Sequence, residues 1–270
     1  MLIVDTHCHA GTNWFEPVEM LVHQMDMNGV AKAVLIQHGG NHDNHYLLEC
    51  LRRFPGRFVA VVGVDVARPD APHILERLAK ERGVVGIRLH PRDRSPGDDP
   101  LAIWRKAGEL GLTISCFLVD ADLTAAPEFQ ALVKALPGCT FVLEHLAGVY
   151  RTRSPGSATP PYTAFRTALN LAKYPNTYIK FGGLGEFCER PAQLPLPLSF
   201  GEVLPLLDMA KEAFGPHRMM WGSDYSPVSG REGYRNALQG PMSQGTFRTD
   251  DDREWAFGKT ALEVWKMDES

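Results

Sequence analysis

The sequence of 270 residues has neither paired cysteines nor a long hydrophobic run. Its five cysteines are scattered and include no CxxC pair, so neither a disulfide framework nor a zinc-ribbon site is indicated. No apolar stretch is long enough to span a membrane, and the opening MLIVDTHCHA lacks the basic and apolar regions of a signal peptide. We therefore expect a cytoplasmic protein that does not bind membranes.

The charged residues also lack an excess of one sign. Lys and Arg number 28 against 32 Asp and Glu, and a net charge of -4 gives no indication of a nucleic-acid partner. The hydrophobic fraction of 44% is enough for a large core, and this length is common for one α/β barrel. We expect a single domain over residues 1–270, whereas the sequence leaves the oligomeric state open.

One pattern recurs eight times along the chain: a short apolar, β-branched run followed by an amphipathic stretch of about three helical turns. Most runs are continuously apolar, which is typical of parallel strands covered on both faces. The pattern predicts an α/β fold, a single (β/α)8 TIM barrel. A doubly wound open sheet uses the same units, but it normally has fewer strands and a Gly-rich phosphate loop after the first strand. The predicted strands lie near Ile3, Leu35, Val61, Ile87, Ile114, Val142, Ile179 and Trp221.

Turns and loops fit the same plan. Several predicted strand-to-helix connections are long and polar, and in a barrel they emerge at the C-terminal face of the strands, where active sites lie. These connections cover residues 90–100, 151–161, 189–199 and 226–249. A glycine follows most predicted helices, at the position where a left-handed residue ends a helix. These glycines are Gly29, Gly56, Gly83, Gly111, Gly138 and Gly215.

Reactive side chains stand where three predicted strands end. The first strand runs into His7 and His9, which point to the same side because they are two residues apart. Asp224 follows the eighth strand, which closes the barrel against the first, and His145 ends the sixth. These four residues are candidate ligands of one divalent ion. Without an ion, Asp224 could take a proton from water, and His145 could polarise a carbonyl or carry a proton.

Basic residues surround this predicted centre. Arg88 and His90 end the fourth strand and face the same way, and Lys180 lies on the seventh. A basic side chain in a barrel mouth suits a substrate carboxylate, so we expect a small, anionic substrate. The alternative for Arg88 is a salt bridge to a neighbouring acid. Further candidates for the pocket are His38, Tyr225, Trp14 and the loop arginines Arg151 and Arg153.

Three motifs carry a family resemblance. DTHCHA at the start, EHLAG after the sixth strand and WGSDYSP near the end together resemble the amidohydrolase superfamily, in particular its amidohydrolase-2 branch of lactonases, hydratases and metal-dependent decarboxylases. The resemblance covers nearly the whole chain and implies matching roles for His7, His9, His145 and Asp224. The segments IQHGGNHDNHYLLECLRRFPGRFVAVVGVD and TYIKFGGLGEF are similar to 2-pyrone-4,6-dicarboxylate and sugar-lactone hydrolases. This implies a hydrolase that opens a carboxylated or polyhydroxylated lactone.

The fifth strand departs from the branch. Its decarboxylases place a metal-binding histidine there, whereas LTISCFLVD offers Cys116 or no ligand. Some lactonases of this type work without metal, so the sequence leaves open whether a zinc or manganese ion is bound. The alternative function is metal-dependent, non-oxidative decarboxylation of an unsaturated or aromatic acid. A non-catalytic binding protein is poorly motivated, because all four residues of the expected centre are present.

Overall fold

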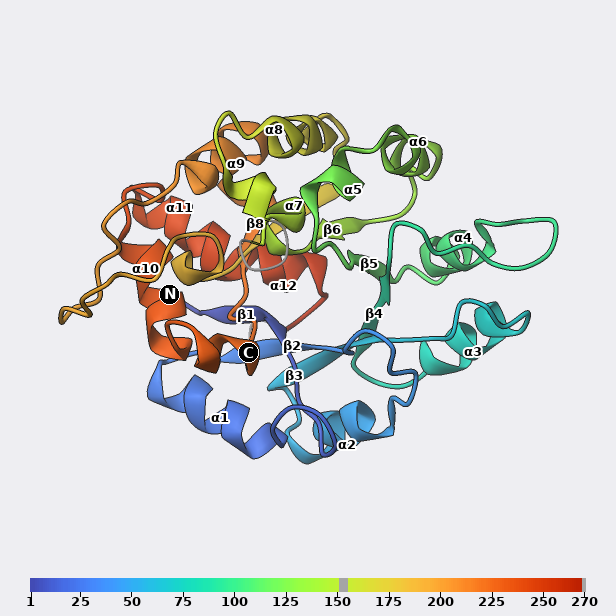
Figure 1. Ribbon diagram of the computed structural model, residues 1–270. Coiled ribbons are helices and arrows are strands. Elements are labelled where there is room, and N and C mark those ends of the chain that lie inside the picture. The colour runs from blue at the N-terminus through green and yellow to red at the C-terminus, as the bar shows by residue number, and fades with distance from the viewer. Residues whose placement is uncertain (151–154, 269–270) are drawn as a thin grey trace.

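The apolar runs of the sequence form eight parallel strands, which lie in chain order in one sheet curved into a nearly closed barrel (Figure 1). The computed structural model describes residues 1–150 and 155–268. All eight predicted strands are confirmed, and with them the (β/α)8 barrel. The strands are β1 (Val4–Cys8), β2 (Lys32–Ile36), β3 (Phe58–Val62), β4 (Val84–Leu89), β5 (Thr113–Cys116), β6 (Phe141–Leu143), β7 (Thr177–Phe181) and β8 (Met219–Trp221).

Most helices surround the barrel and connect successive strands (Figure 1). The helices are α1 (Val18–Met27), α2 (His45–Arg53), α3 (Ala71–Leu78), α4 (Ala102–Glu109), α5 (Ala121–Ala125), α6 (Pro127–Ala135), α7 (His145–Gly148), α8 (Thr163–Leu169), α9 (Leu206–Phe214), α10 (Tyr234–Ser243), α11 (Asp250–Glu254) and α12 (Thr260–Val264). Of these, α10, α11 and α12 follow the last strand, and α7 is a short left-handed turn. Within the described residues, none of the helices is long and apolar enough to cross a membrane.

Two expectations about the connections were wrong in part. The segment 226–249 is not only a polar loop, because it contains α10, whose Tyr234 and Leu238 are buried. Five of the six predicted helix-ending glycines have a positive φ, but Gly138 does not. The reason is that α6 already ends at Ala135, and the chain passes through Pro137 before it reaches this glycine.

Alternating side chains divide the apolar residues into two layers. One cluster fills the barrel interior with β-branched side chains of several strands and is covered by Trp265 after α12. The other, larger cluster lies between the strands and the surrounding helices. The interior cluster includes Val4, Val34, Val61, Val142 and Met220. Above it, at the C-terminal ends of the strands, the interior becomes polar.

The barrel closes between β1 and β8 through backbone contacts that continue past the two strands. The amide of Asp224 donates to the carbonyl of His7 at 2.8 Å, and the amide of His9 donates to the carbonyl of Tyr225 at 2.7 Å. Gly222 permits this close approach, since a Cβ there would lie 2.6 Å from the Cβ of His7. This seam therefore brings Asp224 beside both histidines.

Candidate active site

An irregularity in β1 aims its histidines inward. The pairing of β1 with β2 shifts by one residue between Asp5 and Cys8. As a result, Val4 packs in the interior cluster whereas Cys8 packs in the outer one, although strict alternation would place both on one face. Such bulges often re-aim side chains next to active sites. His7 and His9 consequently both reach the C-terminal mouth of the barrel.

His7, His9 and Asp224 lie within metal-ligand range of one another, as predicted, and all three are buried. The Nδ1 of His9 is 2.8 Å from the carbonyl of Ile36, which leaves its Nε2 as an acceptor 3.7 Å from Oδ1 of Asp224. The Nε2 of His7 lies 3.9 Å from the same oxygen and has no hydrogen-bond partner in the part of the chain that the structure describes. Two nitrogens and a carboxylate oxygen that converge in this way fit a divalent ion such as zinc.

His145 stands beside this group on a left-handed turn. His145, Leu146 and Ala147 all have φ between 48° and 57°, a strained conformation for non-glycine residues that is enriched at functional sites. The Nδ1 of His145 is 2.6 Å from Oε1 of Glu186. Burial acts to lower the pKa of His145, but the charge and hydrogen bond of Glu186, together with the charges of Asp224 and Glu144, outweigh it, so the pKa is raised. His145 shares one possible ligand group with Glu186 and Asp224 and another with His7 and Glu144, but none with His9 among the described residues.

Asp224 has a second partner that the sequence did not predict. The Nη1 of Arg231 donates to Oδ2 of Asp224 at 3.0 Å and to the hydroxyl of Tyr150 at 2.7 Å. Burial is the largest influence on Asp224 and raises the pKa of its carboxyl, against the opposing charges of His145 and Arg231. A buried carboxylate with a raised pKa is a stronger base than an exposed one.

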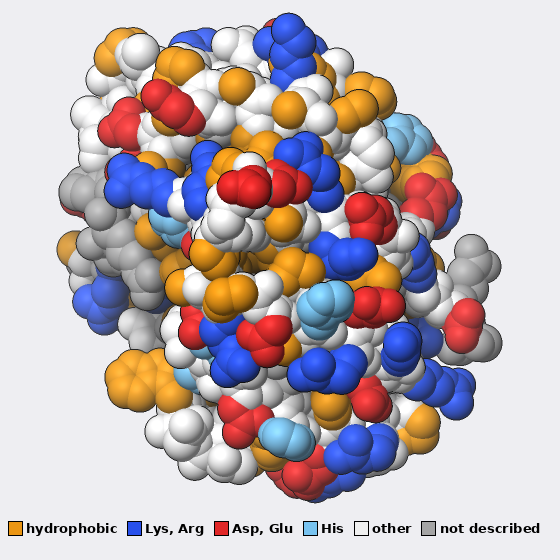
Figure 2. All heavy atoms as spheres, turned by 90° about the vertical axis from the view of Figure 1, so that its right-hand side faces the viewer, with side chains coloured by type: hydrophobic (Ala, Val, Ile, Leu, Met, Phe, Trp, Pro, Cys, Tyr) orange, Lys and Arg blue, Asp and Glu red, His pale blue; other side chains and the backbone are white. Residues whose placement is uncertain are grey.

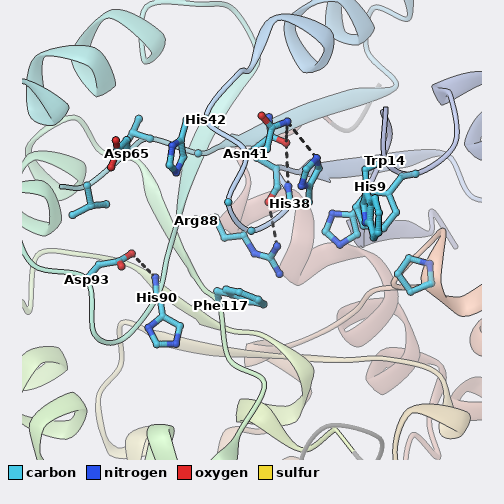
Figure 3. A pocket seen from close by; sticks show the side chains of 18 of the residues that line it. His9, Trp14, His38, Asn41, His42, Asp65, Arg88, His90, Asp93 and Phe117 are labelled. Carbon is cyan, nitrogen blue, oxygen red and sulfur yellow. Dashed lines mark hydrogen bonds between the residues drawn. The ribbon is translucent and has the colours of Figure 1, made fainter. Parts of the chain in front are cut away.

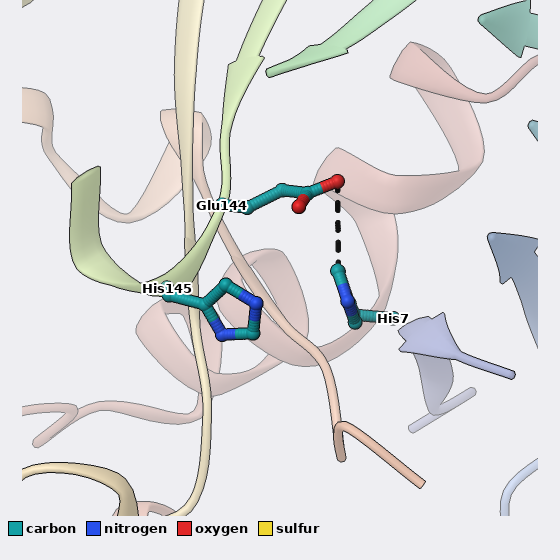
Figure 4. A group of neighbouring side chains, drawn as sticks. All are labelled: His7, Glu144 and His145. Atoms are coloured by element: carbon teal, nitrogen blue, oxygen red, sulfur yellow. Dashed lines mark ion pairs between the residues drawn. The ribbon is translucent and has the colours of Figure 1, made fainter. Parts of the chain in front are cut away.

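Arg88 forms a salt bridge, which was the alternative to substrate contact that the sequence left open. Its guanidinium contacts both carboxylate oxygens of Glu144, the shortest distance being 2.7 Å, and donates to the carbonyl of Gln37 at 3.1 Å. It lies 4.1 Å above the ring of Phe117 (Figure 3). The other side of Glu144 faces His7, whose Nδ1 is 3.9 Å from Oε1, with His145 beside them (Figure 4). The charge of Arg88 is thus largely compensated.

Lys180 is fully enclosed in the barrel below this pair. Its ammonium lies 3.3 Å from the hydroxyl of Ser115 and 3.5 Å from Nδ1 of His7. Burial lowers the pKa of Lys180 to about 8. Lys180 does not line the main pocket, but it lines a small inner hollow together with His7, His145 and Asp224.

A pocket of about 590 Å³ opens above the histidines (Figure 3). His9, His145 and Asp224 lie at its inner end. Its other described lining residues include the predicted Arg88, His38, His90 and Trp14, together with Phe15, whose ring stacks on His9 with 4.8 Å between centroids. Tyr225 does not line it, because its hydroxyl contacts Glu16 on the other side of the seam. Arg151 and Arg153 lie outside the described residues.

Cys116 lies outside the site. It belongs to the cluster between strands and helices, with its Sγ 3.9 Å from the carbonyl of Ile114. The interior position of β5 is held by Ser115, whose hydroxyl donates to Glu144 at 2.7 Å. Cys116 is in none of the possible ligand groups formed by described residues, so the second alternative for strand five, no ligand, is the one that the structure supports.

Sequence reasoning missed the charged partners of the predicted residues. Glu144 and Glu186 were visible in EHLAG and FGGLGEF, directly before His145 and five residues after Phe181. A carboxylate next to a candidate catalytic histidine could have been taken as a signal. Arg231 gave no such signal, because it follows β8 in a segment that was expected to be a loop.

Over the face shown in Figure 2, described acidic and basic side chains are interspersed rather than gathered by sign.

Comparisons with known proteins place this geometry in a family. An L-fucono-1,5-lactonase of Burkholderia ambifaria is 28% identical over 256 residues, which cover 89% of this chain and 82% of the relative. A 4-sulfomuconolactone hydrolase of Hydrogenophaga intermedia is 26% identical over 226 residues, which cover 79% of this chain and 66% of the relative. The solved structure of an amidohydrolase from Burkholderia multivorans with bound zinc shares the fold, with a TM-score of 0.76, 20% identity and coverage of 99% of this chain and 100% of that one.

The family itself is shown by a direct match. The family model described as amidohydrolase matches residues 4–267, which include the first strand, the left-handed turn of His145 and the segment after β8. The resemblance predicted from DTHCHA, EHLAG and WGSDYSP is therefore confirmed, and the chain belongs to the amidohydrolase family.

Proposed function

We propose that this protein is a lactonase that opens a polyhydroxylated, uncharged lactone by attack of water. The observation that carries the proposal is the convergence of Asp224, the His7–His9 pair and the His145–Glu186 pair at the inner end of one pocket. Two relatives with 28% and 26% identity are hydrolases of lactones by name, which supports the same reaction class here.

Each proposed role follows from the protonation state that its surroundings favour. Asp224 accepts a proton from water while the water oxygen bonds to the lactone carbonyl carbon. His145, held protonated by Glu186, donates a proton to the ring oxygen as the bond between that oxygen and the carbonyl carbon breaks. The products are the ring-opened hydroxy acid and an enzyme whose proton returns from Asp224 to His145 through solvent.

We further propose that His7, His9 and Asp224 hold one divalent ion, with zinc as the first candidate. The buried, unpartnered Nε2 of His7 and the fixed tautomer of His9 support this ligand set. A bound ion would supply Lewis acidity for the carbonyl oxygen and would lower the pKa of a bound water. His145 is left out of the proposed ligands because none of the possible ligand groups formed by described residues contains both His145 and His9.

Charges around the pocket favour an uncharged substrate over the anionic one that the sequence suggested. Arg88 is the one lysine or arginine among the described lining residues, and Glu144 already binds its guanidinium. Asp65 and Asp93 line the same pocket and add negative charge. Away from the catalytic centre, where the protonated His145 and the proposed ion carry positive charge, a substrate carboxylate would face two acids and compete with Glu144, whereas hydroxyl groups can donate to the acids and accept from Arg88.

A panel of lactones tests both parts of this proposal. With zinc supplied, a pH-indicator assay should give a kcat/KM at least about tenfold higher for uncharged aldono-1,5-lactones than for carboxylated lactones such as 2-pyrone-4,6-dicarboxylate, because like charges that meet in a pocket cost several kcal/mol. A preference for the carboxylated lactones would overturn the charge argument and leave lactonase chemistry intact. No hydrolysis of any lactone would overturn the lactonase itself.

Removal of metal gives a separate expected result. Treatment with a chelator followed by desalting should lower kcat by about a hundredfold or more, since a metal supplies several kcal/mol of charge stabilisation, and added zinc should restore it. The variant His9→Gln should bind less zinc by elemental analysis, a readout that does not depend on turnover. Full activity in a chelated protein that retains no metal would show that the histidines act directly.

A further inference from the structure

We infer that Arg231 is the positioning residue that fixes the catalytic orientation of Asp224. This rests on the proposed role of Asp224 and goes beyond it, because Arg231 lies at the back of the carboxylate and does not line the pocket. It reaches this place from the turn between β8 and α10.

The contacts of Asp224 divide between its two oxygens. Oδ2 accepts from Nη1 of Arg231 at 3.0 Å, whereas Oδ1 faces the Nε2 atoms of His7 and His9 at 3.9 and 3.7 Å. The same Nη1 donates to the hydroxyl of Tyr150 at 2.7 Å, and Tyr150 packs edge-on against the ring of His145. One guanidinium therefore links the carboxylate to the wall of the pocket. Rotation of Asp224 would break its charge-assisted hydrogen bond to Arg231.

Arg231 is itself held from behind by Glu232. The Nε of Arg231 lies 3.4 Å from Oε2 of Glu232, and the amide of Gly185 donates to Oε1 of Glu232 at 3.2 Å. A Cβ on Gly183 or Gly185 would overlap the Glu232 carboxylate. The glycines in FGGLGEF after β7 thus leave room for this carboxylate. The proposed mechanism uses only Glu186 of this motif. Its glycines have a second role, because they leave room for Glu232, which holds Arg231 in place.

The carboxylates around Arg231 also require a positively charged guanidinium at this position. The three carboxylates of Asp224, Glu186 and Glu232 surround Arg231, and all three raise its pKa against the effect of burial. Without Arg231, the carboxylates of Asp224 and Glu186 would face each other in a buried site, where like charges repel strongly. Lysine cannot replace it fully, because one ammonium does not reproduce the planar fork that joins Asp224, Tyr150 and Glu232.

The inference is tested by measuring the turnover of Arg231 variants on the lactone of the panel that the wild type hydrolyses with the highest kcat/KM. Arg231→Gly should lower kcat by about 10²-fold, the cost of a displacement of about 1 Å in a catalytic group, while KM changes by less than about threefold. Added guanidinium should restore about tenfold of the loss, because it can occupy the vacated site and bind the carboxylates. Methylammonium at equal ionic strength should not. Arg231→Lys should fall between the wild type and Arg231→Gly.

The matched control is Arg218→Gly. Arg218 is half-buried and donates to the backbone carbonyls of Ala172, Tyr174 and Phe214, away from the pocket. Its loss should lower thermal stability without changing kcat, and guanidinium should not raise its activity. A folded Arg231→Gly with wild-type kcat, or equal rescue by methylammonium and guanidinium, would overturn the inference.

A crystal structure of Arg231→Met supplies a readout that needs no substrate. We expect the Asp224 carboxylate to rotate so that Oδ1 leaves its place 3.7 Å from Nε2 of His9. An unmoved carboxylate would overturn the inference even if the kinetic effect were large. If the wild type hydrolysed no lactone, the proposed function would fail, and this structure would still decide whether Arg231 positions Asp224.

Discussion

Replacement of Asp224 with asparagine is expected to lower kcat by about 10²- to 10⁴-fold, the range that a positioned general base contributes. The amide has nearly the same shape and its oxygen can still accept from Arg231, but it cannot take a proton from water. KM should change little, because the other residues that line the pocket are untouched, and the zinc content of the variant separates loss of the base from loss of the proposed ion. Steady-state kinetics on an uncharged aldonolactone would measure both constants.

The matched control for this variant is Asp26→Asn. Asp26 is an exposed residue of α1 whose carboxylate pairs with Arg57 at 2.8 Å, far from the pocket. Exposed ion pairs contribute at most about 1 kcal/mol, so this variant should keep both its fold and its turnover. Near-wild-type kcat in Asp224→Asn would show that another group accepts the proton, and the carboxylate of Glu186 would then be the next to replace.

The strands and the central residues were predictable because both depend on short segments and on one topological rule. Eight apolar runs are visible without knowledge of long-range contacts, and parallel strands in a barrel present their C-terminal ends on one face. That rule alone joins His7, His9, His145 and Asp224. Their shared location needed no knowledge of rotamers, loops or pairing partners.

Most partners of these residues were hard to predict, because they lie far away in the chain. Arg88 and Glu144 are 56 residues apart, and His145 and Glu186 are 41 apart. A cationic residue at a strand end therefore suggested a substrate carboxylate when the protein supplies the anion itself. The orientation of Tyr225 was equally hidden, since it depends on the contact of its hydroxyl with Glu16 across the seam.

The second large effect is expected at the seam itself. Asp5→Ala should lower the free energy of unfolding by about 3–5 kcal/mol, because several buried donors would lose their acceptor at a cost of about 1–3 kcal/mol each. The Asp5 carboxylate accepts from the amide of Ser223 at 2.8 Å, its hydroxyl at 2.6 Å, and the hydroxyl of Tyr234 at 2.9 Å. Without it these buried donors lose their acceptor. Urea unfolding followed by tryptophan fluorescence measures the change.

Two further variants separate the causes. Ser223→Ala removes one of the donors and should cost only about 1 kcal/mol, and combined with Asp5→Ala it should cost less than the sum, because the two share a network. Asp5→Asn keeps the volume but points N–H groups at donors, so a cost close to that of Asp5→Ala would identify lost acceptors rather than a cavity as the cause. A cost below about 1 kcal/mol for Asp5→Ala would contradict the argument.

The seam also connects stability to chemistry. Asp5 accepts from the amide of His7 at 3.1 Å and from both donors of Ser223, the residue before Asp224. It therefore sets the distance between the two sides of the site, across which His7 and Asp224 face each other. Folded Asp5→Asn should lose activity in addition to stability, since a shift of about 1 Å in a catalytic group can cost about 10²-fold in rate. Wild-type kcat in a destabilised Asp5→Asn would restrict Asp5 to barrel closure.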